Sequence, residues 1–230
     1  MLIRSLPLIA GVVPFAAINL AYWIGVNWGP LPACLPYIDG CTSISATGRY
    51  PPGSFLFRAV EMPFSVLLVV VWYFTVAWLG KLRPALDKSR RSWILAWGIV
   101  GAIALIVYVT FLGTKEAPYE FMRRFGIYFY FLGTAVAQIF VSLHLLKVAA
   151  RLTALRRVTL TLLWLSLLPF ALGILNLVLK EILADPDAME NAIEWVAASL
   201  MQAWFIALYF AWKRTGFDAT VSVGSTSDHS

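Results

Sequence analysis

Residues 55–79 read FLFRAVEMPFSVLLVVVWYFTVAWL and contain only two charged side chains, Arg58 and Glu61. The hydrocarbon core of a bilayer is about 30 Å thick, so a helix needs about 20 mostly apolar residues to cross it. The stretch is long enough, and both of its charges lie near one end. It therefore predicts a transmembrane helix.

Five further apolar runs along the chain have a similar length. They cover approximately Leu6–Ile24, Trp93–Leu112, Phe125–Lys147, Thr159–Leu179 and Ala192–Trp212. Each is too long and too apolar for a typical helix of a soluble protein. The sequence predicts an all-α integral membrane protein, in which residues 1–215 form a six-transmembrane-helix bundle.

The composition agrees with this class. Hydrophobic residues make up 60% of the 230 residues and charged residues 13%, against about 45–50% and about 25% in soluble domains. Such a composition excludes a nucleic-acid-binding module, a disordered chain and a secreted disulfide scaffold. Two cysteines and two histidines supply few ligands for a metal, so neither a metal nor another cofactor is predicted.

The basic residues are distributed unevenly between the two sides of the predicted bundle. Twelve of the 18 lie at the termini and in the second and fourth connections. Because cytoplasmic loops carry the excess of Lys and Arg, both termini are predicted to be cytoplasmic. The tail, residues 216–230, is rich in Ser, Thr and Gly and is predicted to be disordered.

The first connection, residues 25–54, is the only long one and contains five of the twelve prolines. Loops of this length are commonly functional, and its prolines and aromatic residues predict a structured extracytoplasmic cap over the mouth of the bundle. Cys34 and Cys41 lie in it, on the oxidising side of the membrane. They are candidates for a disulfide, and two free thiols in a packed cap are the alternative.

Most polar residues of the predicted spans lie in the same, extracytoplasmic half of the membrane. They include Arg58 and Glu61 in the second span, Arg123 and Arg124 at the start of the fourth, Asn176 in the fifth and Glu194 in the sixth. Polar groups in hydrocarbon are costly and usually face the bundle interior, which predicts a shared polar pocket. The alternative is a set of ion pairs and hydrogen bonds that only hold helices together.

Short motifs give the chain a resemblance to a known family. They are SISA at 43–46, PP at 51–52, FR at 57–58, MRRFG at 122–126 and AIEW at 192–195. In these motifs and in its span pattern the chain resembles the six-span FRAG/DRAM/SFK family, which includes the autophagy modulators and the Golgi GPI lipid-remodelling factor. The resemblance implies a six-span fold and a role in lipid (GPI-type) remodelling or in membrane organisation.

The residues limit the chemistry available to an enzyme. No G-x-S-x-G motif occurs, and neither histidine lies on the extracytoplasmic side, so a serine–histidine hydrolase is not expected. Glu61 and Glu194, if desolvated and close, are candidates for a general acid and base. Whether the protein is an enzyme stays open.

The remaining candidates are ligand-binding residues. Arginine matches phosphate geometry with two hydrogen bonds, so Arg58, Arg123 and Arg124 are candidates for a phosphate clamp, with Asn176, Ser43 and Ser45 behind them. Local hydrogen bonding in a turn is the preferred interpretation of the two serines.

These observations predict a multi-pass membrane protein that binds the headgroup of an outer-leaflet phospholipid or glycolipid, anionic or phosphate-bearing. Its partners are then membrane lipids and not nucleic acid, and the sequence does not identify any protein partner. The alternative is a non-enzymatic organiser that regulates lipid distribution and signalling partners. A small transporter is less favoured because its polar groups would lie at mid-depth.

Overall fold

The computed structural model describes residues 2–218, which form helices and connecting loops with no strand. The long helices are α1 (Leu2–Trp28), α4 (Gly53–Leu82), α5 (Lys88–Phe111), α6 (Ala117–Ala149), α7 (Thr153–Ile182) and α8 (Asp187–Arg214), and two short ones are α2 (Pro36–Asp39) and α3 (Ile44–Thr47). All six long helices are long and apolar enough to cross a membrane. The predicted six-span bundle is confirmed.

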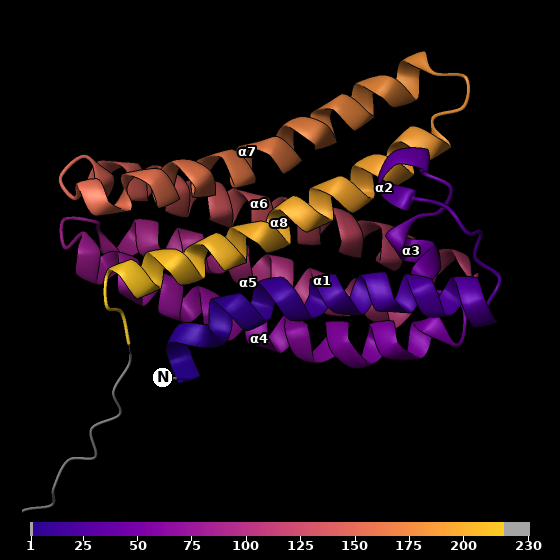
Figure 1. Cartoon of the computed structure of the whole chain (residues 1–230), viewed down its shortest axis with the longest axis horizontal. Helices are drawn as coiled ribbons and strands as arrows, with labels where there is room; N and C mark the ends of the chain where they lie inside the picture. Colours follow the sequence, from indigo (N-terminus) through magenta and orange to yellow (C-terminus); the bar gives the residue numbers. More distant parts are fainter. Residues whose placement is uncertain (1, 219–230) are drawn as a thin grey trace, which may run out of the picture.

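The six long helices form a closed ring in chain order. Each packs against the next along the chain, and α8 returns to α1. The start of α1 and the end of α8 lie at one end of the bundle, whereas α2 and α3 lie at the other (Figure 1). We call these ends the termini end and the loop end.

Large aromatic side chains fill the centre of the ring. Trp72 of α4 contacts Trp204 and Phe205 of α8, with ring centroids 5.6 Å apart in both pairs. The Trp204 indole donates a hydrogen bond to the Ser142 hydroxyl of α6. Since none of these rings is more than 1% exposed, the interior of the bundle is packed rather than an open channel.

The helix bounds extend past the apolar runs that predicted them. The first turn of α8 contains Asp187 and Glu190 and its last turn Lys213 and Arg214. Acids near a helix N-terminus and bases near its C-terminus interact favourably with the helix dipole. Polar residues at both ends therefore continue the helix, and hydropathy alone underestimates its length.

The tail predicted to be disordered is described only in part. Phe217 is 8% exposed and contacts the rings of Trp78 and Trp212. Packing thus continues past residue 216, and residues 219–230 lie outside the described part of the chain.

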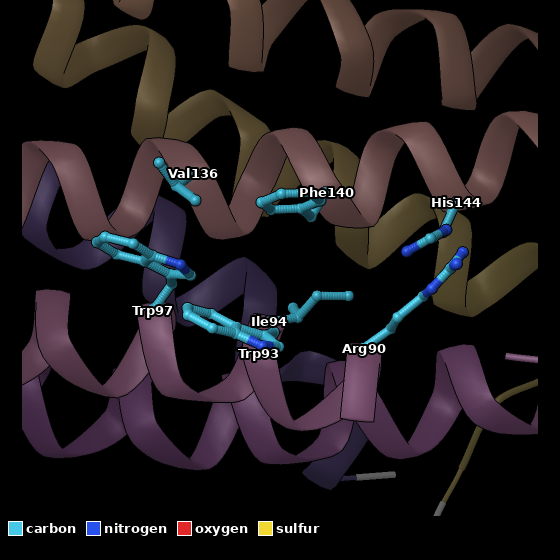
Figure 2. Close-up of a pocket in the computed structure, with 7 residues that line it drawn as sticks. All are labelled: Arg90, Trp93, Ile94, Trp97, Val136, Phe140 and His144. Carbon is cyan, nitrogen blue, oxygen red and sulfur yellow. The ribbon is translucent and has the colours of Figure 1, made fainter. Parts of the chain in front are cut away.

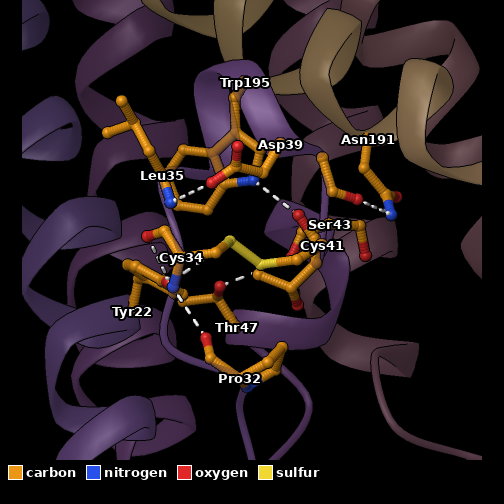
Figure 3. Close-up of a disulfide and its surroundings, with 12 residues drawn as sticks. Tyr22, Pro32, Cys34, Leu35, Asp39, Cys41, Ser43, Thr47, Asn191 and Trp195 are labelled. Atoms are coloured by element: carbon orange, nitrogen blue, oxygen red, sulfur yellow. Dashed lines mark hydrogen bonds between the residues drawn. A yellow bond between two sulfur atoms is a disulfide. The ribbon is translucent and has the colours of Figure 1, made fainter.

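The first connection is docked onto α1 and α8 at the loop end. Cys34 and Cys41 form a disulfide (Figure 3). The Tyr22 hydroxyl accepts a hydrogen bond from the Cys34 N–H, and the Trp195 indole donates one to the carbonyl of Thr42. The structured cap predicted from prolines and aromatics is what the structure shows.

Gly40 fixes the turn between α2 and the disulfide. Its φ is +58°, and an added Cβ would collide with the carbonyl oxygen of Ala188 in α8. A non-glycine residue in this left-handed conformation costs about 1–2 kcal/mol, and the collision adds to that cost. Gly40 is therefore required both for the turn and for the contact with α8.

We expect Gly40→Ala to lower the free energy of unfolding by at least about 2 kcal/mol and to expose the disulfide to reductant. Gly173→Ala is the matched control, since no atom lies within 4 Å of its added Cβ and alanine favours a helix. Thermal unfolding and the rate of disulfide reduction measure both effects. Equal behaviour of the two variants would mean that the cap is not held at Gly40.

Candidate functional site

A small cavity of about 30 Å³ lies inside the loop-end half of the bundle. Its polar lining comes from four helices and consists of Glu61, Tyr108, Tyr130, Glu194 and Gln202. Among the described residues, no Arg, Lys or His lines it. We call it the Glu61 cavity, and its lining is acidic.

Glu61 is the most unusual residue of this lining. It lies in α4, is 3% exposed, and its Oε1 atom has no hydrogen-bond partner within the described residues. A buried polar group without a partner costs about 1–3 kcal/mol. The fold therefore carries a carboxyl group whose hydrogen-bonding capacity is unused.

Glu194, in the second turn of α8, connects the cavity to the cap. Its carboxyl group faces the backbone N–H groups of Ile44 and Ser45 and the Ser45 hydroxyl. These are N–H groups of the first turn of α3, which have no partner inside that helix. Ser43 is the N-cap of α3, and its hydroxyl accepts the Ala46 N–H at 3.0 Å.

Ser45 extends the network from Glu194 to α5. Its Oγ lies 2.9 Å from the Tyr108 hydroxyl. A serine hydroxyl has one proton, so when it donates to Glu194 it accepts from Tyr108. The predicted turn role of the serines thus holds for Ser43, whereas Ser45 links two side chains that line the cavity.

Three lining residues were not among the sequence-predicted site residues: Tyr108 and Tyr130, from α5 and α6, and Gln202 from α8. Tyr108 is 2% exposed and Gln202 5%. The available signal was a polar-tipped side chain in an otherwise apolar span, but tyrosines are also common at membrane interfaces. The sequence alone therefore does not show whether such a tyrosine lies in the bundle interior or at the membrane interface.

The predicted arginine clamp is not assembled around the cavity. The exposed Arg58 donates a hydrogen bond to the carbonyl of Leu112, at the end of α5. Arg123 and Arg124 both pair with Glu120 on their own helix, at 3.6 and 2.7 Å. All three arginines lie at the loop end, held by local partners.

Arg123 is the arginine that approaches the cavity. It lies one helical turn before Ile127, which lines the cavity. Its side chain is 18% exposed, compared with 65% for Arg124. Arg123 thus lies near the cavity on the loop-end side, a position that we call the rim, without lining the cavity itself.

Asn176 lies apart from this group. It is partly exposed on α7, the helix whose apolar window is only 17% buried, against 39–50% in the other five. Asn176 therefore does not line the cavity with the two acids.

The described residues contain no group of three or more His, Cys, Asp or Glu placed to hold a metal ion. The chain matches no protein-family model, no curated protein and no solved structure.

Proposed function

We propose that the protein binds the headgroup of a membrane lipid at the loop end, with a hydrogen-bond donor of that headgroup inside the Glu61 cavity. One observation carries the proposal: Glu61 lines the cavity, and the Oε1 atom of its carboxyl group is buried without a hydrogen-bond partner. Intramembrane ionisable residues are functional candidates by default. A ligand that donates to Oε1 removes the cost of leaving that atom without a partner.

The lining defines the chemistry of the donor. Two glutamates, two tyrosines and Gln202 line the cavity without a basic side chain, so an ammonium group or a sugar hydroxyl fits and a phosphate does not. A water-sized group needs at least about 10–15 Å³, and the cavity offers about 30 Å³. The cavity takes the tip of a headgroup, and the rest of the lipid lies outside it.

The rim of the cavity carries the positive charge that the phosphate of such a lipid requires. Arg123 stands one turn closer to the loop end, and guanidinium groups bind phosphate with two hydrogen bonds. Arg58 and Arg124 place further positive charge at the same end of the bundle. A lipid with both an ammonium group and a phosphate satisfies the cavity and its rim together.

The orientation of the bundle in the membrane decides which leaflet supplies the lipid. With cytoplasmic termini, as the basic residues predict, the Glu61 cavity lies in the outer-leaflet half of the bundle. Glu61 and Glu194 line one cavity, where they would bind the tip of the headgroup, and the acyl ester bonds of the lipid would lie outside their reach. The resemblance to the FRAG/DRAM/SFK family supports the lipid assignment.

Thermal unfolding with defined lipids tests the proposal. Three lipids with identical acyl chains are compared. Phosphatidylethanolamine presents an ammonium group and a phosphate, a monoglucosyl diacylglycerol presents sugar hydroxyls without a phosphate, and phosphatidic acid presents a phosphate alone. We expect the first to stabilise the protein most and phosphatidic acid least, because a ligand that binds the folded state raises its stability. Glu61→Gln should lose the preference, and Glu120→Gln, which changes an exposed acid of the same end, should keep it.

The other outcomes separate the alternatives. A preference for phosphatidic acid would mean that the lipid binds at the loop-end arginines and not in the Glu61 cavity. Equal stabilisation by all three lipids, in wild type and Glu61→Gln, would contradict a headgroup site and favour the non-enzymatic organiser.

A further inference from the structure

A second and much larger cavity, of about 550 Å³, lies between α5 and α6 toward the termini end (Figure 2). Trp93 and Phe140 line it and are 62% and 43% exposed, so it opens on the lateral surface of the bundle. We call it the α5–α6 groove. A volume of this size is typical of sites that hold small molecules.

The glycines of α5 and α6 explain where the groove begins. At Gly133 an added Cβ would lie 2.8 Å from the backbone of Trp97 and of Gly101, so the two backbones touch there. From this crossing to the termini end, neither helix has another glycine at the interface. Bulky side chains separate the helices instead, and they leave space between them.

Aromatic rings form the walls of the groove. The rings of Trp93 and Trp97 stack with an interplanar angle of 28° and a centroid distance of 6.5 Å, and Phe140 faces them from α6 (Figure 2). Val136 and His144 mark the two ends of the α6 wall. Eight residues of helix rise about 12 Å, so the groove matches a large part of one acyl chain.

One end of the groove is cationic. The side chain of Arg90 extends toward His144 there (Figure 2), and Arg83 contacts the Nδ1 atom of His144 at 2.8 Å. Because a guanidinium can only donate, Nδ1 is the acceptor, and the Nε2–H of His144 is a donor.

The surrounding charges keep this end positive. Arg83, Arg90 and Lys147 lie near enough to act on His144, and Asp87 is the one acid that does so. Asp87 also caps α5 through the Arg90 N–H and forms an exposed ion pair with the Arg90 side chain. Three positive charges against one negative charge, beside an apolar groove, match an anion that carries a long apolar chain.

We propose that the α5–α6 groove binds an anionic phospholipid, with one acyl chain along Trp93, Trp97 and Phe140 and the phosphate at Arg90 and His144. A zwitterionic lipid gains less at this end because its cation is repelled, and a sterol has no phosphate to place there. The inference is independent of the Glu61 cavity, which has the opposite charge and lies in the other half of the bundle.

Native mass spectrometry with two lipids tests the groove. The full-length protein is equilibrated with dioleoyl phosphatidylglycerol or dioleoyl phosphatidylcholine, which have the same chains and differ in net charge. We expect one phosphatidylglycerol to be retained with about tenfold preference over phosphatidylcholine. Arg90→Gln should reduce this preference severalfold, and Val136→Trp, which fills the groove, should reduce the retention of phosphatidylglycerol.

Arg157→Gln is the matched control, since Arg157 is an exposed arginine of the same end but does not line the groove. It should keep the wild-type preference. An equal loss in Arg157→Gln and Arg90→Gln would mean that only the general charge of the surface matters. Equal retention of both lipids by the wild-type protein would also overturn the proposal, and Arg90→Gln remains informative if Val136→Trp does not fold.

Discussion

Glu61→Met is expected to raise the free energy of unfolding of the lipid-free protein by about 1–3 kcal/mol. The carboxyl oxygen Oε1 is buried without a hydrogen-bond partner, whereas methionine has a similar size and no polar oxygen to leave unpaired. Replacing buried charged groups by apolar residues of similar volume is often neutral or stabilising. The same variant should lose the stabilisation by phosphatidylethanolamine, because the group that accepts from the headgroup is gone.

Thermal and denaturant unfolding in detergent, with and without lipid, measure both effects. Glu120→Met is the control: Glu120 is exposed and pairs within its own helix, so its replacement should change stability by less than about 0.5 kcal/mol. If Glu61→Met were destabilised by several kcal/mol, the carboxyl group would be a structural brace. A brace at Glu61 would contradict a site kept for a ligand.

Glu194→Ala is expected to have the opposite effect, a loss of about 3 kcal/mol of folding free energy. The change removes the carboxyl group that faces the N–H groups of Ile44 and Ser45, and a buried donor left without an acceptor costs about 1–3 kcal/mol. Glu194→Gln retains an amide oxygen as an acceptor and should cost about 1 kcal/mol. It should remain folded and still weaken lipid retention.

Limited proteolysis within residues 29–52, together with thermal unfolding, distinguishes the two Glu194 variants. Glu194→Ala should release the cap to the protease and Glu194→Gln should not. If both variants were as stable as the wild type, the hydrogen bonds between Glu194 and α3 would contribute nothing to docking the cap.

The spans could be predicted from the sequence because length and hydropathy decide them. Residues 55–79 lie within α4 (Gly53–Leu82), and the other five runs also lie inside or nearly inside their helices. The ends of the helices were less predictable, because first and last turns that contain charged residues, such as those of α8, continue the helix without being apolar.

The sequence predicted that Glu61 and Glu194 lie close together, but it did not predict where the side chains of the arginines point. Glu61 and Glu194 line one cavity, as a shared depth in the membrane suggested. Depth, however, does not fix the direction in which a residue points around its helix. Arg124 lies at a similar depth and yet is 65% exposed, beside Glu120.

The direction in which a side chain points around its helix is set by packing contacts, which the hydropathy of the sequence does not show. These helices are apolar on nearly all sides, so no polar stripe marks the face that points to the interior. Asn176 illustrates the difficulty: it lies on α7, the helix with the least buried surface, and stays out of the cavity. Tyr108 lines the cavity and is linked to the cap by the contact of its hydroxyl with Ser45.

Native mass spectrometry of the gently solubilised protein with its endogenous lipid tests most directly whether a headgroup donor binds at Glu61. We predict one dominant lipid with an ammonium group or a sugar in the wild-type protein, and its loss in Glu61→Gln. Arg157→Gln, which changes an exposed arginine of the termini end, should retain the same lipid. The same unselective set of lipids in wild type and Glu61→Gln would contradict the account.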